Sequence, residues 1–289
     1  MTELTQIHFF ADTSRFARRL AREIAAAPPV RIAEHRFPDG ETLVRVHTPV
    51  ARHAVLVRSL HDPNAKLVET LLAADALRRG GAKRITLVAP YLPYMRQDEV
   101  FHPGEPLSQR VVGNWLGSSF DRVLAIEAHL HRIARLGEVV SGVSLTAAPA
   151  IAGWLRRGRG GALVVGPDAE SEPWVRTIAA AAGSPWIVGH KQRYADRSVV
   201  VTLPAVAGCR RAVIVDDIAS SGVTLAATAR ALRRHGVTHI EAVVVHAIFA
   251  SGAAERIRAA GVERVISCDT IPHPSNAIPC AALIAGALR

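Results

Sequence analysis

Two adjacent acids at the end of an apolar run are the feature of this sequence most suggestive of chemistry. Residues 210–222 read RRAVIVDDIASSG, in which Ala212–Val215 predict a buried strand and Asp216 and Asp217 follow directly. A strand with a purely structural role needs no pair of carboxylates at its end. Carboxylates there suit the hydroxyl groups of a sugar, from which they accept hydrogen bonds, or a metal ion.

The loop after these acids is made of small residues. Ser220, Ser221, Gly222 and Thr224 precede or begin a helix that we expect to start near Val223. Unpaired amides and the helix dipole make such a place an anion site, so a phosphate explains the small side chains. An ordinary helix capped by one of the serines is the alternative, but it leaves the two acids unexplained. Acids followed by a phosphate cradle together indicate a phosphorylated sugar.

Other segments carry residues able to bind a nucleotide or a metal. Residues 36–41, RFPDGE, contain a turn signal, and an aromatic beside the turn can stack on an adenine. Residues 90–98, PYLPYMRQD, bring an arginine and a glutamine into an exposed loop, where the arginine can bind phosphate and the glutamine offers a bidentate amide. The basic segment 189–198, GHKQRYADRS, is either a solvated hairpin connection or a set of cations for a polyphosphate.

Two further side chains are candidates for metal binding. His129 follows the apolar run RVLAIE, with His131 two residues further on, and histidines two apart on a strand would share a face. Imidazole is an unusual direct ligand for Mg²⁺, so a contact through water or phosphate is equally compatible with the sequence. Asp168, in the turn GPDAE after the run ALVVG, offers a harder oxygen ligand.

The elements that must position these residues alternate between short apolar runs and amphipathic stretches. In the first half, IHFF, AVLVRSL, RITLVAP and RVLAIE predict strands, and Phe16, Leu20 and Ile24 mark one face of a helix. The second half repeats the plan, with helices expected at 172–183, 222–235 and 251–260. Continuous apolar strands in a β-α-β order predict an α/β fold of mainly parallel sheets flanked by helices. A boundary near residue 148 divides the chain into two domains, and ligands are expected beyond the carboxyl ends of the strands.

Composition agrees with a packed protein that has anionic partners. The chain has 289 residues, of which 49% are hydrophobic, and a formal net charge of +10. The positive charge favours phosphates, nucleotides or nucleic acid, although an arginine-rich solvated surface is an equal explanation. Three cysteines without metal-type spacing predict free thiols, and no apolar run is long enough to span a membrane. We therefore expect a cytoplasmic protein with no membrane partner.

The motifs together resemble a known family. VIVDDIASSGVT resembles the phosphoribosyl-pyrophosphate (PRPP) motif shared by phosphoribosyltransferases and ribose-phosphate pyrophosphokinases, and alone does not choose between them. RFPDGE, PYLPYMRQDEVFHPGEPLS and IEAHLHR look like the nucleotide and metal segments of the pyrophosphokinases, also called PRPP synthetases. VVGPDAE, HKQR and SCDTIP fit the second half of that family. The length and the FHPGEPLS segment are similar to the short archaeal-type members.

The resemblance implies a fold and a reaction. The fold would be two phosphoribosyltransferase-like domains, residues 1–147 with the ATP-binding segments and 148–289 with the PRPP motif and a catalytic loop. The reaction would transfer pyrophosphate from MgATP to the C1 hydroxyl of ribose 5-phosphate, giving PRPP and AMP. Mg²⁺ would be the cofactor, ATP and ribose 5-phosphate the partners, and a homo-oligomer, dimer or higher, the assembly.

The resemblance also assigns roles to individual residues. The catalytic residues would be Lys191 and Arg193. Magnesium would be associated with His129 and, at a second metal position, with Asp168. The contacts to ATP would be Phe37, Asp39, Gly40, Glu41, Arg96 and Gln97. The contacts to ribose 5-phosphate would be Arg193, Asp216, Asp217, Ser220, Ser221, Gly222, Val223 and Thr224.

Alternatives from other classes remain at this point. Val223 stands where the family loop has glycine, which favours a non-catalytic regulatory relative, whereas retention of HKQR favours an enzyme. A phosphoribosyltransferase that consumes PRPP would lack the RFPDGE and RQD segments. A nucleic-acid binder is supported by net charge alone, because no recognition module is present.

Overall fold

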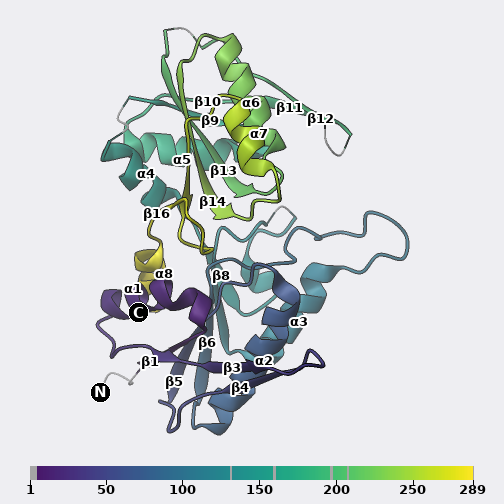
Figure 1. Ribbon diagram of the computed structural model, residues 1–289, viewed down its shortest axis with the longest axis vertical. Helices are drawn as coiled ribbons and strands as arrows, with labels where there is room; N and C mark the ends of the chain where they lie inside the picture. Colours follow the sequence, from purple (N-terminus) through teal and green to yellow (C-terminus); the bar gives the residue numbers. More distant parts are fainter. Residues whose placement is uncertain (1–4, 131, 159–160, 196–197, 207, 289) are drawn as a thin grey trace. The chain divides into compact units, whose positions relative to one another are not determined.

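The computed structural model describes residues 5–130, 132–158, 161–195, 198–206 and 208–288, without the side chains of 193–198. The chain forms two compact units. The first consists of the chain up to Thr146 together with the segment from Ala281, and the second is Ala147–Cys280. Each unit is described by itself below (Figure 1).

The first unit is built on a sheet of six parallel strands in the order β2-β1-β5-β6-β7-β8. The strands are β1 (Thr5–Phe9), β2 (Val30–Arg31), β5 (His53–Val57), β6 (Arg84–Ala89), β7 (Arg122–Ile126) and β8 (Gly142–Leu145). The helices are α1 (Ser14–Glu23), α2 (Pro63–Arg79), α3 (Ser108–Ser119) and α8 (Ala281–Leu288), with single turns η1 (Ala11–Thr13) and η2 (Leu136–Glu138). Helices α1 and α8 pack together on one face, and α2 and α3 on the other (Figure 1).

The sequence pattern explains why this sheet is parallel and covered on both faces. All five residues of β5 are buried, as are the last five of β6, so these strands have no polar face to present to water. Such strands are stable only where helices cover both sides of the sheet. Phe10, Leu56, Leu77 and Leu116 are fully buried in a core between this sheet and helices α2 and α3.

A two-stranded antiparallel hairpin, β3 (Ala33–Arg36) with β4 (Thr42–Arg45), lies outside the sheet of the first unit. All four residues of β3 are exposed, and β4 alternates between half-buried and exposed residues. Strand β4 packs on α2, and Val44 and Val46 contact the core. The turn between the two strands is the RFPDGE segment.

The second unit repeats the architecture with a six-stranded parallel sheet in the order β10-β9-β13-β14-β15-β16. The strands are β9 (Leu163–Gly166), β10 (Trp186–Val188), β13 (Arg211–Ala219), β14 (His239–Ala247), β15 (Arg264–Cys268) and β16 (Asn276–Ile278). The helices are α4 (Ala148–Arg156), α5 (Glu172–Ala182), α6 (Val223–Arg234) and α7 (Ala253–Ala259), with the single turn η3 (Ala169–Ser171). Helix α4 packs on α5, and α6 packs on α7.

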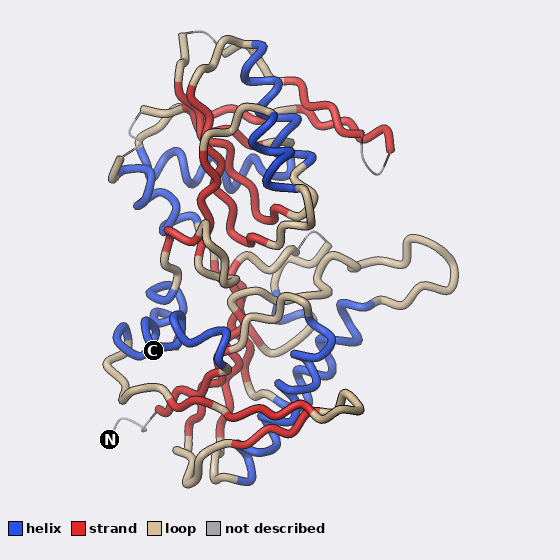
Figure 2. The backbone as a smooth tube through the Cα atoms, viewed as in Figure 1, coloured by secondary structure: helices blue, strands red, loops and turns tan. Residues whose placement is uncertain are grey.

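The basic segment near residue 190 forms a second hairpin, β11 (His190–Ala195) with β12 (Ser198–Thr202). Figure 2 shows this hairpin extending away from the sheet of its own unit. Lys191 is paired with Val201 and Arg193 with Val199, and the register shifts between Arg193 and Ala195. The backbone of this segment is thus a hairpin. A hairpin is compatible with both a solvated connection and a set of cations that bind a polyphosphate.

The fold-class prediction is confirmed, since both sheets are parallel and flanked by helices. One boundary differs from the expectation, because α8 belongs to the first unit and not to a domain spanning 148–289. Helix α8 packs on α1, and Arg122 donates a hydrogen bond to the carbonyl oxygen of Ala287 at 2.9 Å. In Figure 1 the yellow α8 lies beside the purple α1. No helix in the described part of the chain combines the length and apolar character needed to cross a membrane.

Candidate active site

The two acids lie near the carboxyl end of β13, which is longer than the sequence predicts. The strand continues through Asp216 and Asp217 to Ala219, with Asp216 opposite Val244 and Ala219 opposite Ala247 of β14. The carboxylate of Asp216 accepts a hydrogen bond from the amide of Asp217 at 3.1 Å, and that of Asp217 accepts one from the amide of Ile218 at 2.7 Å. Pairing of Asp216 and Ile218 with β14 therefore fixes the backbone at both acids.

Asp168 and Lys191 join these acids from two other elements of the same unit. Asp168 follows β9 and caps η3, where its Oδ1 accepts a hydrogen bond from the amide of Ser171 at 3.2 Å. Its other carboxylate oxygen forms an ion pair with Nζ of Lys191, which projects from β11. Both side chains are largely buried. The strand ends of β9 and β13 and the base of the hairpin thus assemble one charged site.

Electrostatics in this site favour a cationic partner for Asp216. Burial raises the pKa of Asp216 well above its ordinary value, and the neighbouring carboxylates of Asp217 and Asp168 raise it further. Lys191 opposes this rise without cancelling it. A carboxyl group in that state gains from any ligand that brings positive charge or hydroxyl donors close to it.

The loop after β13 has the geometry of an anion cradle. Gly222 has φ = +72°, and Val223 is the first residue of α6, so the glycine carries the left-handed conformation. Neither Ser220 nor Ser221 caps the helix, because Gly222 is the N-cap residue and no side chain accepts a capping hydrogen bond. First-turn amides have no partner within their helix. The capped-helix explanation of the serines is therefore wrong.

Gly222 is also required by its packing against α7. A Cβ at this position would lie 2.9 Å from Cγ1 and Cδ1 of Ile257 and 3.1 Å from the carbonyl oxygen of Ala253. The loop can approach α7 so closely only without a side chain. Arg256 of α7 donates a hydrogen bond to the carbonyl oxygen of Ser221 and so holds the loop from the same side.

Replacement of this glycine gives a first prediction. We expect Gly222→Ala to be destabilised by about 1–2 kcal/mol from its left-handed backbone and by roughly 1–3 kcal/mol more from the contact with Ile257. Gly236→Ala is the matched control, because Gly236 has φ = +81° and nothing within 4 Å of a Cβ. Urea unfolding of both variants measures the difference. Equal destabilisation of the two would contradict the packing argument.

In the first unit, four of the residues expected to contact ATP, Phe37, Asp39, Gly40 and Glu41, form the turn of the β3–β4 hairpin. The amide of Phe37 donates to the carbonyl oxygen of Glu41 at 2.8 Å, and that of Gly40 donates to the carbonyl oxygen of Phe37 at 3.0 Å. The carboxylate of Asp39 accepts a hydrogen bond from the amide of Glu41 at 3.1 Å, and Gly40 has φ = +95°. The Phe37 ring is 39% exposed, with His35 edge-on at 4.8 Å. Hydrogen bonds therefore close the turn, and the Phe37 ring remains partly exposed beside it.

Arg96 and Gln97 lie in the irregular segment between β6 and α3, drawn in tan in Figure 2. Ser108 donates to the side-chain oxygen of Gln97 at 2.5 Å, and the amide of Gln109 donates to its carbonyl oxygen at 3.2 Å. The side chain of Arg96 is exposed. The start of α3 therefore anchors this loop and leaves the guanidinium of Arg96 free to move toward a ligand.

The expected metal residues belong to different units. His129 lies in a loop and not on a strand, because β7 ends at Ile126, and His131 lies outside the described residues. Asp168 belongs to the charged site of the second unit described above. Among the described residues, no three side chains of histidine, cysteine or acid form a ready metal cluster. The oxygen donors around Asp216 fit Mg²⁺, which typically keeps several waters and shares its ligands with substrate phosphates.

Comparison with known proteins defines the family. The N-terminal domain of ribose phosphate pyrophosphokinase matches residues 7–119, and the phosphoribosyl synthetase-associated domain matches residues 176–285. A ribose-phosphate pyrophosphokinase of Methanopyrus kandleri is 34% identical over 282 residues, which are 95% of each chain. The chain belongs to the ribose-phosphate pyrophosphokinase family. The family predicted from the sequence motifs is thus confirmed.

Further ribose-phosphate pyrophosphokinases agree with this placement. The protein of Thermococcus kodakarensis is 33% identical over 88% of this chain and 90% of its own. The crystal structure of phosphoribosylpyrophosphate synthetase from Mycobacterium smegmatis matches with a TM-score of 0.82 and 25% identity, over 98% of this chain and 97% of that one. The likeness extends over both units and is not confined to the PRPP motif.

Two arginines of this pyrophosphokinase-family chain were missed by sequence reasoning. Arg256, which holds the carbonyl of Ser221, lies in no motif, and its position in the middle of the short helix α7 gives no signal. Arg58 is buried among three acids and interrupts the apolar run AVLVRSL. A charged residue within an apolar run of the sequence was a signal that could have found it.

Proposed function

We propose that this protein is a ribose-phosphate diphosphokinase, which transfers pyrophosphate from MgATP to the C1 hydroxyl of ribose 5-phosphate. The hydroxyl oxygen forms a bond to the β-phosphorus of ATP, the bond between that phosphorus and the α,β-bridging oxygen breaks, and AMP leaves. The hydroxyl proton passes to solvent. The observation that carries the proposal is the 34% identity to a ribose-phosphate pyrophosphokinase over 95% of both chains.

The second unit is proposed to bind ribose 5-phosphate. Asp216 and Asp217 accept hydrogen bonds from the ribose hydroxyls, and the amides from Ser220 to Thr224 bind the 5-phosphate at the start of α6. The support is the placement of the acids on the paired strand β13 and the left-handed Gly222 at the start of the loop's helix. Val223 has helical geometry, which removes the reason for preferring a non-catalytic regulatory relative.

The hairpin turn and the following loop of the first unit are proposed to bind ATP. Phe37 stacks on the adenine, while Asp39, Gly40 and Glu41 contact polar groups of the nucleotide. Arg96 and Gln97 bind its phosphates, with the planar guanidinium matching two phosphate oxygens. The exposed Phe37 ring on a hydrogen-bonded turn supports this assignment.

Lys191 and Arg193 are proposed as the catalytic residues. Both stabilise the negative charge that develops on the transferring group, which is the main contribution a protein makes to phosphoryl-type chemistry. Mg²⁺ at two positions, one associated with Asp168 and one with His129, would supply charge neutralisation and orientation of the phosphates when bound. The ion pair of Lys191 with Asp168 supports a position of this cation within the charged site. No residue is assigned as a general base.

Incubation of the pure protein with MgATP and ribose 5-phosphate tests the proposed function. We expect AMP and PRPP in equal amounts, identified by mass spectrometry. A phosphoribosyltransferase would instead consume added PRPP and release pyrophosphate. The absence of AMP above the level of a blank without ribose 5-phosphate would reject the proposed reaction.

We also propose a homo-oligomer, dimer or higher, located in the cytoplasm. The free cysteines Cys209, Cys268 and Cys280 are compatible with a reducing compartment. Helix α2 contacts both α3 and β4, and these elements expose large apolar side chains that a second copy would cover. These side chains are Val68, Leu72, Val111, Trp115 and Leu43.

A second prediction tests the proposed assembly. Trp115 is 52% exposed on α3, and we expect Trp115→Lys to reduce the oligomer mass in analytical ultracentrifugation, because a charge would be buried in the interface. Lys83→Ala, a change at an exposed residue outside this surface, serves as the control and should keep the wild-type mass. A Trp115→Lys protein with unchanged mass would place the interface elsewhere.

A further inference from the structure

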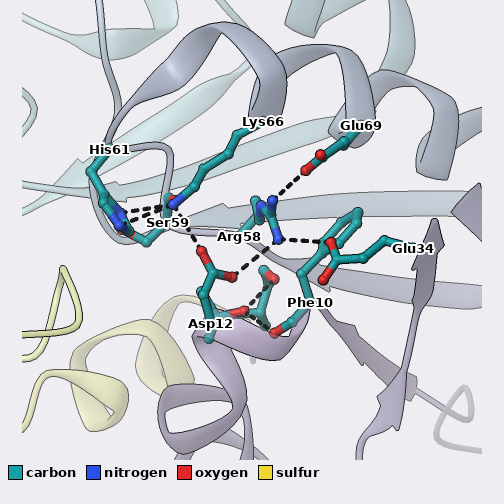
Figure 3. Close-up of polar contacts among 10 residues, drawn as sticks. Phe10, Asp12, Glu34, Arg58, Ser59, His61, Lys66 and Glu69 are labelled. Atoms are coloured by element: carbon teal, nitrogen blue, oxygen red, sulfur yellow. Dashed lines mark hydrogen bonds and ion pairs between the residues drawn. The ribbon is translucent and has the colours of Figure 1, made fainter. Parts of the chain in front are cut away.

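Arg58 is a buried arginine directly after β5. The residue is 4% exposed, and its amide donates a hydrogen bond to the carbonyl oxygen of Val88 at 3.0 Å. Its guanidinium lies 3.9 Å from the centroid of the Phe10 ring. Figure 3 shows it at the centre of a group of acidic side chains. This group has no part in the proposed chemistry.

The guanidinium joins three segments that are distant in sequence. It lies 3.1 Å from Asp12 of η1 and 3.7 Å from Glu34 of β3, and it also pairs with Glu69 of α2. Lys66 of α2 binds the second oxygen of Asp12 at 2.8 Å. The Arg58 network, as we call Arg58 with these three acids and Lys66, thus connects the loop after β1, the hairpin and α2 (Figure 3).

Stability alone is a poor explanation for this network. Removing charges from water costs about as much as their pairing returns, so apolar residues of similar volume often serve as well. Burial raises the pKa of Glu69 despite the nearby Arg58, and Nε of Arg58 has no acceptor among the described residues. What a buried guanidinium does provide is a fixed position for each carboxylate that it contacts.

Glu34 is the member of the network for which a fixed position matters most. It belongs to β3, whose four residues are all exposed, so side-chain packing does little to hold this strand. His35 follows directly and contacts the ring of Phe37 edge-on. The path from Arg58 through Glu34 and His35 therefore ends at the aromatic ring proposed to stack on adenine.

We infer that the pair of Arg58 and Glu34 is a tether that sets the position of the β3–β4 hairpin and thereby the affinity for the adenine nucleotide. Both are positioning residues, because they act through the hairpin turn. The nucleotide part of this inference rests on the proposed ATP-binding role of Phe37. The tether itself rests on the contacts of the first unit alone.

Glu34→Gln and Glu69→Gln form a matched pair that tests the tether. Each removes the charge of one acid paired with Arg58, but only Glu34 lies in the hairpin. We expect Glu34→Gln to raise KM for ATP roughly two- to fivefold, the range of a modest ion pair, with kcat and KM for ribose 5-phosphate unchanged. Glu69→Gln should change thermal stability and leave all three kinetic parameters at wild-type values.

Hydrogen exchange of the free protein gives a readout that needs no activity. We expect the amides of Phe37 and Gly40, which close the turn, to exchange faster in Glu34→Gln by a similar factor, and to be unchanged in Glu69→Gln. Unchanged exchange in Glu34→Gln, or equal effects of the two variants, would overturn the tether. Faster exchange without any change in KM for ATP would overturn its link to the nucleotide. Faster exchange in a protein that makes no PRPP would keep the tether and reject the proposed function.

Arg58→Lys provides a further check on geometry. Lysine keeps the charge but not the planar fork that reaches several carboxylates together. We expect its turn amides to exchange faster than those of the wild type, with KM for ATP raised as in Glu34→Gln. In the double variant Arg58→Lys with Glu34→Gln, amide exchange in the turn and KM for ATP should differ little from those of either single variant. Both changes act on the hairpin through the same contact between Arg58 and Glu34. Fully additive effects would contradict the tether.

Discussion

Lys191→Ala is expected to lower the turnover number by about 10²–10³, the usual effect of removing one preorganised charge contact to a transition state. Lys191 projects from the base of the β11–β12 hairpin into the charged site, where it pairs with Asp168. Because the developing charge belongs to the transition state, KM values for both substrates should change far less than kcat. Steady-state kinetics with MgATP and ribose 5-phosphate measure this split.

The control for this change is Lys83→Ala, which removes an exposed lysine of the first unit and should keep wild-type turnover. Circular dichroism and the unfolding temperature establish that the Lys191 variant is folded. A folded Lys191→Ala protein with turnover near that of the wild type would remove this lysine from the mechanism. A rise in KM for ATP with unchanged kcat would instead assign it to ground-state binding.

Asp216→Asn is expected to weaken ribose 5-phosphate binding roughly 10- to 100-fold, the effect of losing hydrogen bonds to a charged acceptor. KM for ATP should remain within about threefold of the wild-type value, because the proposed nucleotide contacts lie elsewhere. Asp75→Asn is the control, since Asp75 is an exposed acid on α2 paired only with its helical neighbour Arg79 in the described structure. Equal weakening of both substrates would contradict the assignment of Asp216 to the sugar.

The same variant should be more stable than the wild type without ligand, and increasingly so as pH rises. The pKa of Asp216 is raised in the folded protein, so the folded state holds a proton that the unfolded state has released. Stability of the wild type is therefore lost as pH rises from the ordinary value, about 3.9, through the raised one. Asparagine does not ionise, so the variant does not lose stability in this way as pH rises. Unfolding temperatures of both proteins at about pH 4 and about pH 8 measure the gain in stability from Asp216→Asn. The same gain at both pH values would refute this account.

The sequence predicts the sheets because their signal is local. Continuous apolar runs such as those of β5 and β14 require burial on both faces. Because helices are expected between these strands, a parallel sheet covered by helices is the arrangement that provides this burial. The placement of Gly222 at the left-handed position and Val223 as a helical residue was also predictable, since glycine tolerates φ > 0 and a β-branched residue resists it.

What could not be predicted depends on partners distant in sequence. Strand β13 extends past its two acids because β14 offers pairing partners as far as Ala247, which no local pattern reveals. The acids around Arg58 lie at 12, 34 and 69, on a single turn, a hairpin strand and a helix, and only the tertiary fold brings them together. The ion pair between Asp168 and Lys191 joins a strand end to a hairpin 23 residues further along the chain, and no local pattern reveals that contact.

Helix α8 follows the second unit in the sequence but belongs to the first unit, and this affects the order in which the chain can fold during synthesis. Contacts of α8 with α1, and the hydrogen bond from Arg122 to Ala287, are part of the first unit. A nascent chain that ends at Thr146 lacks them, and the whole of Ala147–Cys280 must be translated before they form. The earlier-made unit is thus completed last, with the apolar surface of α1 exposed in the interval, where a chaperone can bind it.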